Sequence, residues 1–421
     1  MENQQLDSLY NNKSRPLLLA VCLISYFFCG YVSTLLSVYL PVVVKELVSQ
    51  VRSENMDEVS AYMGSMFLLG WMLGGISLGF LGDYIGRIKA FAIAGILYSV
   101  FTILIGFTHN WVLVVVFRFI SGIGVGGTIV LATILIAEAW PLKSRAIVLG
   151  ILAVTFPIGI VTAGIANNAF STWRMAFLPA FVPLVASLTA LFFLKDSLEW
   201  RQHKERSRTQ TGRYISLFDT ENKNNIISGS LIFGTMLIGL WAIFSWMPTW
   251  VQSLFPTEDL GRQERGVTMM ILGSGGIVGG ALSGYLINLI GYKRTILLTF
   301  AGSFVMCFVL FKTNDTFSYL VYLETALLAF FFGISQGALS SYLPELFPAA
   351  IRSTATGFCF NIGRLATAAA VFFVGAMVQI LGGYGNAVLV FSITFLIGFV
   401  VTLFSAEALP HDESNLILTN D

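Results

Sequence analysis

Three ionisable side chains lie inside long apolar runs of this sequence, where an ionisable group is costly and is by default a functional candidate. They are Arg118, Glu324 and Arg364. Asn361 precedes Arg364 by three positions, so in a helix the two side chains share a face. A guanidinium on such a face could bind the carboxylate of an organic anion through two parallel hydrogen bonds. The alternative is a structural arginine tied to backbone carbonyls or to loop acids.

Two short motifs occur twice in the chain, at an interval of 205 to 207 residues. The glycine-rich segment 79–89 returns in part at 284–294, where Asn288 stands in place of an aspartate. The motif E-x-x-P-x-x-x-R at 138–145 returns unchanged at 345–352. Two matched pairs of motifs predict two halves related by an axis along the membrane normal, as in transporters that work by alternating access.

Segment 79–89 closely resembles the loop signature of the major facilitator superfamily, G-x-L-[AG]-D-x-x-G-R-[RK]-[RK], and departs from it only at Ile88. The resemblance implies a transporter whose loop charges form a cytoplasmic lock that breaks when the inner side opens. With the second motif, the predicted lock residues are Asp83, Arg87, Glu138, Arg145, Glu345 and Arg352. Because Asn288 is uncharged, the lock of the second half should be weaker.

Segment 342–366 resembles the sugar-porter, aromatic-acid and sialic-acid symporter, and organic-ion transporter branches of this family. In organic-anion transporters, an arginine twelve residues after the junction arginine contacts the anionic substrate, and Arg364 stands twelve residues after Arg352. The predicted substrate-binding residues are Arg364, Asn361, Trp241 and Tyr31. The two aromatic side chains could stack on a substrate ring, although lipid-facing or belt positions explain most such residues.

Arg118 and Glu324 are 206 residues apart and are therefore equivalent under the repeat. We expect each to lie about two turns from the outer surface, where they could form an ion pair between the halves that opens when substrate enters, or could face their own halves. Family members often pair this arginine with an acid on the first helix. Because residues 17–44 contain no Asp or Glu, Glu324 becomes the candidate for carrying a coupling proton.

The composition shows what must position these groups. Of the 421 residues, 56% are hydrophobic and only 11% are charged, too few to cover a surface that faces water. Apolar runs long enough to cross ~30 Å of hydrocarbon must be helical, because lipid satisfies no backbone groups. Twelve such runs begin near Leu17, Ser60, Ile88, Trp111, Ile147, Met175, Ile226, Thr268, Thr295, Phe317, Ser353 and Tyr384. We predict an all-α membrane protein of twelve transmembrane helices in two pseudo-symmetric six-helix bundles.

A long polar stretch separates the sixth and seventh runs and divides the chain. It predicts an N-terminal bundle at 1–194, a basic cytoplasmic linker at 195–225 and a C-terminal bundle at 226–421. Most Lys and Arg residues fall on one side of the membrane if the N-terminus is inside. The positive-inside rule then places both termini in the cytoplasm, with the chain in the plasma membrane.

These features favour a secondary transporter that moves a small organic anion, such as an aromatic, sugar or sialic acid, with a proton as the coupling ion. A facilitative uniporter of a neutral sugar or an organic cation, and a membrane receptor, are the alternatives. No enzyme is predicted, since no nucleophile, metal set or base–acid pair is apparent. The four cysteines lack metal-ligand spacing, so we expect no metal and no cofactor. Substrate, proton and lipid are the expected partners, and nucleic acid is not.

Overall fold

The computed structural model of the protein describes residues 14–48, 56–196, 220–257, 260–347 and 352–406. All regular structure in these ranges is helical, and twelve helical segments are long and apolar enough to cross a membrane. The predicted fold class and number of spans are therefore confirmed. The domain boundaries at 194 and 226 stay a prediction, because most of the linker lies outside the described residues.

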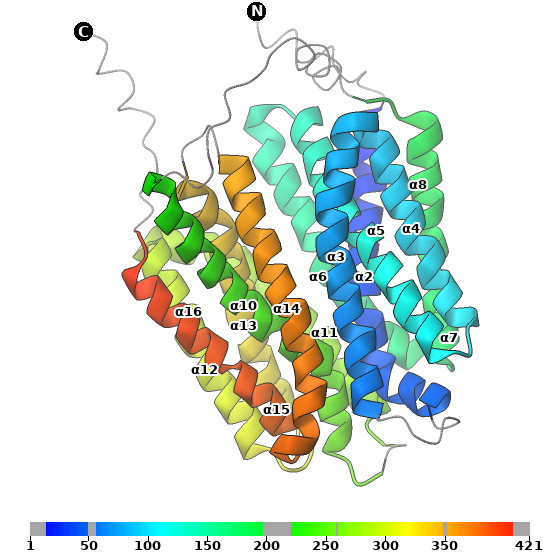
Figure 1. The fold of residues 1–421 in the computed structure, drawn as a ribbon, viewed down its shortest axis with the longest axis vertical. Coiled ribbons are helices and arrows are strands. Elements are labelled where there is room, and N and C mark those ends of the chain that lie inside the picture. Colours follow the sequence, from blue (N-terminus) through cyan, green and yellow to red (C-terminus); the bar gives the residue numbers. More distant parts are fainter. Residues whose placement is uncertain (1–13, 49–55, 197–219, 258–259, 348–351, 407–421) are drawn as a thin grey trace, which may run out of the picture.

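The first six spans form one bundle, with its helices in blue to green in Figure 1. They are α2 (Arg15–Val48), α3 (Met56–Ile85), α4 (Arg87–Phe107), α5 (Trp111–Ala139), α6 (Leu142–Ala169), and a sixth span built from α7 (Trp173–Phe177), a 3-10 turn (Leu178–Ala180) and α8 (Phe181–Phe193). The turn from α3 to α4 passes through Gly86, whose φ of 115° favours glycine.

The last six spans form the second bundle, coloured green to red. They are α10 (Thr220–Ser253), α11 (Arg262–Ile290), α12 (Tyr292–Thr313), α13 (Leu320–Glu345), α14 (Arg352–Leu381), and a last span built from α15 (Tyr384–Phe391) and α16 (Ile393–Phe404). Several helices begin before their apolar runs. At 1.5 Å per residue the 34 residues of α10 measure about 51 Å, which is more than the thickness of the hydrocarbon. The helix therefore extends beyond the hydrocarbon, and its first turns are polar.

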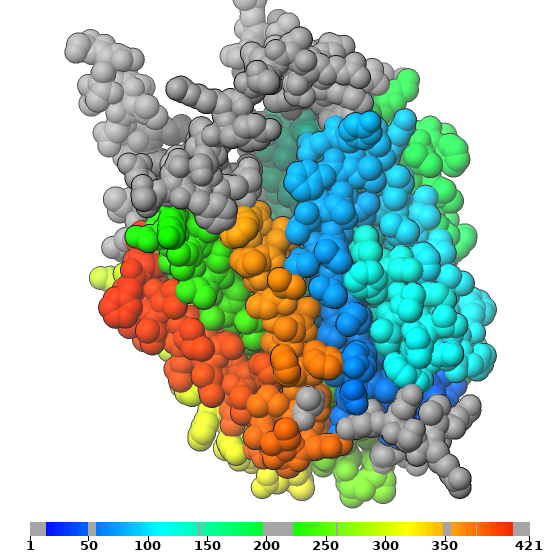
Figure 2. Space-filling view, in the orientation of Figure 1, coloured from blue at the N-terminus to red at the C-terminus, as the bar shows by residue number. Residues whose placement is uncertain are grey.

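Helices from both bundles meet at the centre of the molecule. Packing joins α3 to α14 and α6 to α11, and Figure 2 shows the orange atoms of α14 against the blue atoms of α3. The approach of α6 to α11 is close, since a Cβ atom on Gly164 would come within 2.5 Å of the Gly266 carbonyl oxygen. Small residues allow membrane helices to pack backbone to backbone in this way.

The two ends of the bundles differ. We call the end at which α2 begins and α16 ends the terminal face, and the other end the opposite face (Figure 1). At the opposite face the halves are hydrogen-bonded to each other. The Tyr384 hydroxyl donates to Asp57 Oδ1 at 2.5 Å, and Asn167 Nδ2 donates to the Arg262 carbonyl at 2.6 Å. The Arg262 guanidinium donates in turn to the carbonyl oxygens of Asn167 and Phe170, where α6 ends. These contacts hold the opposite face closed.

Candidate functional site

A cavity of about 640 Å³ lies between the two bundles. Its walls come from α2, α3, α5 and α6 of the first bundle and from α10, α11, α13 and α14 of the second. It reaches toward the terminal face, because the lining residues Gly150 and Ser340 lie near the ends of α6 and α13 at that face. Its volume is that of a small-molecule site. The cavity thus lies between the two bundles and extends toward the terminal face.

A continuous row of aromatic rings crosses this cavity from one bundle to the other. Tyr26 lies 6.2 Å from Phe156, which lies 5.9 Å from Trp71. Trp71 of α3 then meets Trp241 of α10 at 5.3 Å, with the rings nearly perpendicular, and Trp241 lies 6.1 Å from Phe244. These centroid separations are typical of favourable aromatic pairs. The row gives the cavity an apolar, flat-sided wall suited to a planar ring or an unsaturated chain.

Arg364 is the one charged side chain in the described lining of the cavity. It extends from α14, is half-buried, and lies with its guanidinium carbon 5.8 Å from the centre of the Trp71 ring. Its Nη1 donates to Asn361 Oδ1 at 3.4 Å, a long hydrogen bond. A guanidinium carries five N–H donors, so most of its capacity is left for a bound anion.

Two of the predicted substrate-binding residues lie in the cavity wall, a third lies beside one of them, and the fourth lies elsewhere. Trp241 and Arg364 line the cavity, and Asn361 holds Arg364 while its own amide donates to the Gly357 carbonyl at 2.9 Å. Tyr31 does not reach the cavity. It is 2% exposed, and its hydroxyl donates to the Ala176 carbonyl at 2.6 Å.

The reason for the Tyr31 error is helical rotation. Five residues advance the direction of a side chain by about 140° around the axis of an α-helix. Tyr26, five positions earlier on α2, therefore faces the cavity and Tyr31 faces α7. Either tyrosine could have been chosen from the sequence, because both lie in an apolar run that is buried on most sides.

Arg118 and Glu324 are not paired with each other, and each faces its own bundle, the second of the two arrangements expected. Arg118 Nη1 donates to the Val32 carbonyl of α2 at 2.9 Å. Glu324 Oε2 accepts a hydrogen bond from Asn314 Nδ2 at 2.6 Å. Because α13 begins at Leu320, Glu324 lies about one turn from the helix end and is half-buried, so it is closer to the outer surface than the two turns expected.

Three of the predicted lock residues do come together, at the terminal face. Arg87 Nη2 pairs with Asp83 Oδ1 at 2.5 Å, and Arg87 Nε lies 3.5 Å from Glu138 Oε1. The three side chains connect α3, α4 and α5 of the same bundle. Sequence reasoning missed a third acid, Asp196, whose Oδ1 accepts the backbone N–H of Ile88 at 2.7 Å, where the dipole of α4 favours a negative charge.

Two further lock residues, Arg145 and Glu345, are not brought to this cluster. Arg145 Nε donates to the Trp140 carbonyl at 3.3 Å. Glu345 is the last residue of α13, and the side chain of Arg352 lies outside the described residues. The counterpart Asn288 is exposed.

Sequence reasoning also missed Trp71 and Phe156. The pair Gly70 and Gly74 on α3 could have indicated the direction of the Trp71 side chain. A Cβ atom on either glycine would collide with a backbone carbonyl of α5, so this face of α3 must pack against α5, and Trp71 is turned toward the second bundle. Among the residues that the structure describes, no group of three or more His, Cys, Asp or Glu side chains could hold a metal ion.

Comparison with known proteins is consistent with this geometry. The family model described as Major Facilitator Superfamily matches residues 22–371. The cis,cis-muconate transport protein of Acinetobacter baylyi is 28% identical over 368 residues, covering 84% of this chain and 87% of that protein. The benzoate transport protein of the same organism is 24% identical, covering 96% and 91%. The inward open structure of the xylose transporter XylE from E. coli has a TM-score of 0.76 at 17% identity, covering 94% and 97%.

Proposed function

The chain belongs to the Major Facilitator Superfamily, a family of membrane transporters rather than enzymes, and on this premise we propose that it is a secondary transporter of a small organic anion. The observation that carries the proposal is Arg364, the one charged side chain in the described lining of an aromatic cavity between the two halves. Alternating access supplies the mechanism, with the halves separating in turn at either face of the membrane.

The chemistry of the cavity favours a carboxylate on a planar, unsaturated body. A guanidinium meets a carboxylate with two parallel hydrogen bonds, and this pairing is stronger in a poorly hydrated cavity than at a surface. The row of rings from Tyr26 to Phe244 offers faces and edges to the apolar part of the substrate. Muconate and benzoate, which appear in the names of two relatives, are both unsaturated carboxylates and support this substrate class.

The membrane is proposed to be the plasma membrane, with the terminal face toward the cytoplasm, as the distribution of basic residues predicts. In that orientation the cavity reaches toward the cytoplasm, and the hydrogen bonds of Tyr384 and Arg262 close the outer side. The cluster of Asp83, Arg87 and Glu138 then forms the part of the cytoplasmic lock that belongs to the first half. The ion pairs of Arg87 with Asp83 and Glu138 lie within the first bundle.

A proton is the proposed coupling ion, and the geometry favours Asp57 over Glu324 as its carrier. Coupling requires a carboxylate whose surroundings change when the halves separate. Asp57 accepts a hydrogen bond across the two halves, from Tyr384, so opening the opposite face replaces this partner with water. Glu324 is bound to Asn314 within one bundle, and the movement of the bundles leaves that contact intact.

Ligand discrimination by the purified protein tests the proposal. Benzoate and cis,cis-muconate should raise the melting temperature, while neutral benzamide and a neutral sugar should not. A ligand at 100 times its Kd stabilises the folded state by about 2.7 kcal/mol, which is readily measured. Proteoliposomes should then accumulate radiolabelled benzoate. Stabilisation by the sugar and not by either carboxylate would instead identify a carrier of neutral substrates.

A further inference from the structure

Arg118 is a buried cation whose hydrogen bonds go to backbone carbonyls. Its side chain is 2% exposed, and its guanidinium donates to the carbonyl oxygens of Val32 at 2.9 Å and Ser33 at 3.5 Å. The guanidinium carbon lies 3.8 Å from the centre of the Phe67 ring. Nε has no hydrogen-bond partner among the described residues. A buried charge that no carboxylate neutralises is strongly destabilising, which points to an anionic partner at another stage of the cycle.

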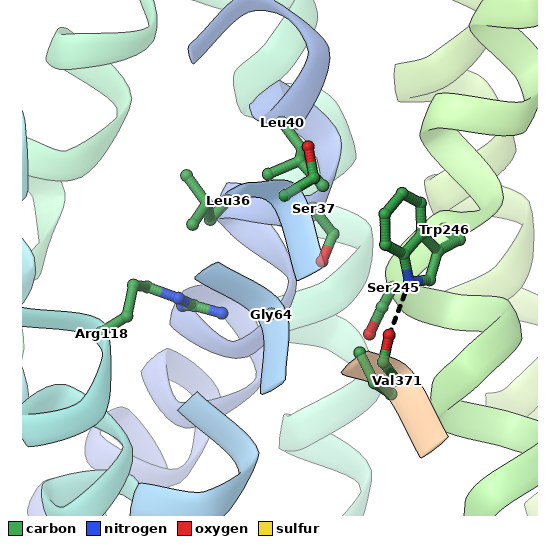
Figure 3. A pocket seen from close by; sticks show the side chains of 9 residues that line it. Leu36, Ser37, Leu40, Gly64, Arg118, Ser245, Trp246 and Val371 are labelled. Carbon is green, nitrogen blue, oxygen red and sulfur yellow. Dashed lines mark hydrogen bonds between the residues drawn. The ribbon is translucent and has the colours of Figure 1, made fainter. Parts of the chain in front are cut away.

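This guanidinium borders a second, small cavity of about 10 Å³, just large enough for one water molecule. Figure 3 shows Arg118 extending from α5 toward Gly64 of α3, with Ser245 and Trp246 of α10 on the far side. The Trp246 ring is fixed by a hydrogen bond of 3.2 Å to the Val371 carbonyl of α14. Because the walls belong to both halves, separation of the halves at the opposite face must enlarge this cavity.

An aromatic pair on α3 lies between the two arginines, with Trp71 in the lining of the large cavity and Phe67 buried beside Arg118. Phe67 and Trp71 lie one turn apart on α3, with ring centres 5.9 Å from each other. Arg118 lies over the first ring, and Arg364 lies 5.8 Å from the second. These three separations place the two guanidinium carbons no more than about 15.5 Å apart. A carboxylate that leaves one arginine therefore has no more than this distance to travel to the other once the halves separate and uncover Phe67.

We propose that Arg118 is the first binding site for the carboxylate of the substrate when the opposite face is open, and that the substrate passes from it along Phe67 and Trp71 to Arg364. The inference rests on the proposed transport of an organic anion. In this conformation the first site is collapsed around Arg118, and the second site is open to the terminal face.

The test measures the concentration of radiolabelled benzoate that half-saturates uptake from each face separately. Right-side-out and inverted membrane vesicles expose one face each, and protease removal of a C-terminal tag identifies the face that carries the termini. Arg118→Gln should raise the half-saturating concentration at least tenfold at the opposite face and less than twofold at the terminal face. Arg118→Lys keeps the charge and should show the same asymmetry with a smaller factor, so it decides the matter if the glutamine variant does not fold.

Arg174→Gln is the matched control, because Arg174 also lies over an aromatic ring at the opposite face of this bundle but is paired with Glu46 at 2.5 Å. It should leave both values unchanged. If folded Arg118 variants shift both faces alike, the relay is refuted while the proposed function stands. If the unmodified protein takes up neither benzoate nor muconate, the proposed function fails and the relay fails with it.

Discussion

Replacement of Arg364 tests the proposed site most directly, because the structure separates its effect on binding from its effect on folding. Its hydrogen bond to Asn361 is 3.4 Å long, beyond the usual range of about 2.7 to 3.2 Å. Loss of such a bond should lower the free energy of unfolding by less than about 1 kcal/mol. The apparent melting temperature without ligand should therefore change little in Arg364→Ala and Arg364→Lys.

The effect on binding should be much larger. A hydrogen bond to a charged group contributes about 1.5 to 3 kcal/mol, which corresponds to roughly a 10- to 150-fold change in Kd. Arg364→Lys retains the charge but loses the planar fork that matches a carboxylate, so it should fall near the lower value. Arg364→Ala loses both charge and fork and should fall near the upper value.

The assay compares benzoate with neutral benzamide by thermal shift and by competition for uptake. Benzamide keeps the ring that contacts Trp241 and lacks the charge, so the ratio of the two affinities reports the carboxylate alone. The unmodified protein should prefer benzoate strongly, and folded Arg364→Ala should lose that preference. If this variant discriminates between the two ligands as well as the unmodified protein does, Arg364 has a structural role and the substrate anion is recognised elsewhere.

Two further predictions concern the lock and the coupling proton. Asp83→Asn should slow vesicle uptake about 2- to 5-fold, because its ion pair with Arg87 is part-exposed and such pairs contribute up to about 1 kcal/mol. Asn288→Asp should change the uptake rate less. Equal effects of the two substitutions would contradict the asymmetry of the two halves. Asp57→Asn should abolish substrate accumulation driven by a pH gradient but leave substrate exchange measurable. Glu324→Gln should retain accumulation. Tyr384→Phe removes the hydrogen bond to Asp57 but keeps the acid, so it should retain accumulation as well. Accumulation that survives in Asp57→Asn would exclude that carrier.

The fold could be predicted from the sequence because lipid leaves the backbone few choices. An apolar run that must cross the hydrocarbon has to be a helix, so the number of spans followed from counting. The pairing of Arg87 with Asp83 also depends on local sequence, since the two stand four residues apart at a glycine turn.

The lining of the site could not be predicted to the same degree, because it depends on how each helix is rotated. Tyr26 and Tyr31 have similar sequence surroundings, and only the packing of α2 against α6 and α7 decides which one faces the cavity. Glu324 shows a second limit. A shift of three residues in the start of α13 moves the carboxylate by almost a turn, from the membrane interior to the helix end beside Asn314.

The different surroundings of the two arginines suggest why an anion should drive the conformational cycle. Arg118 is buried against two carbonyls and a ring of its own bundle, while Arg364 lies in a cavity that reaches toward the terminal face. Closing that cavity without a substrate would bury the Arg364 guanidinium with one long hydrogen bond, at a cost of several kcal/mol. A bound carboxylate neutralises the charge and supplies two hydrogen bonds, so it lowers the free energy of the occluded state more than that of the open state. Only such a differential interaction can shift a conformational equilibrium. A neutral molecule of the same shape would fill the cavity but would not lower the free-energy cost of burying the Arg364 guanidinium. Benzamide should therefore bind weakly and should not be exchanged across the membrane.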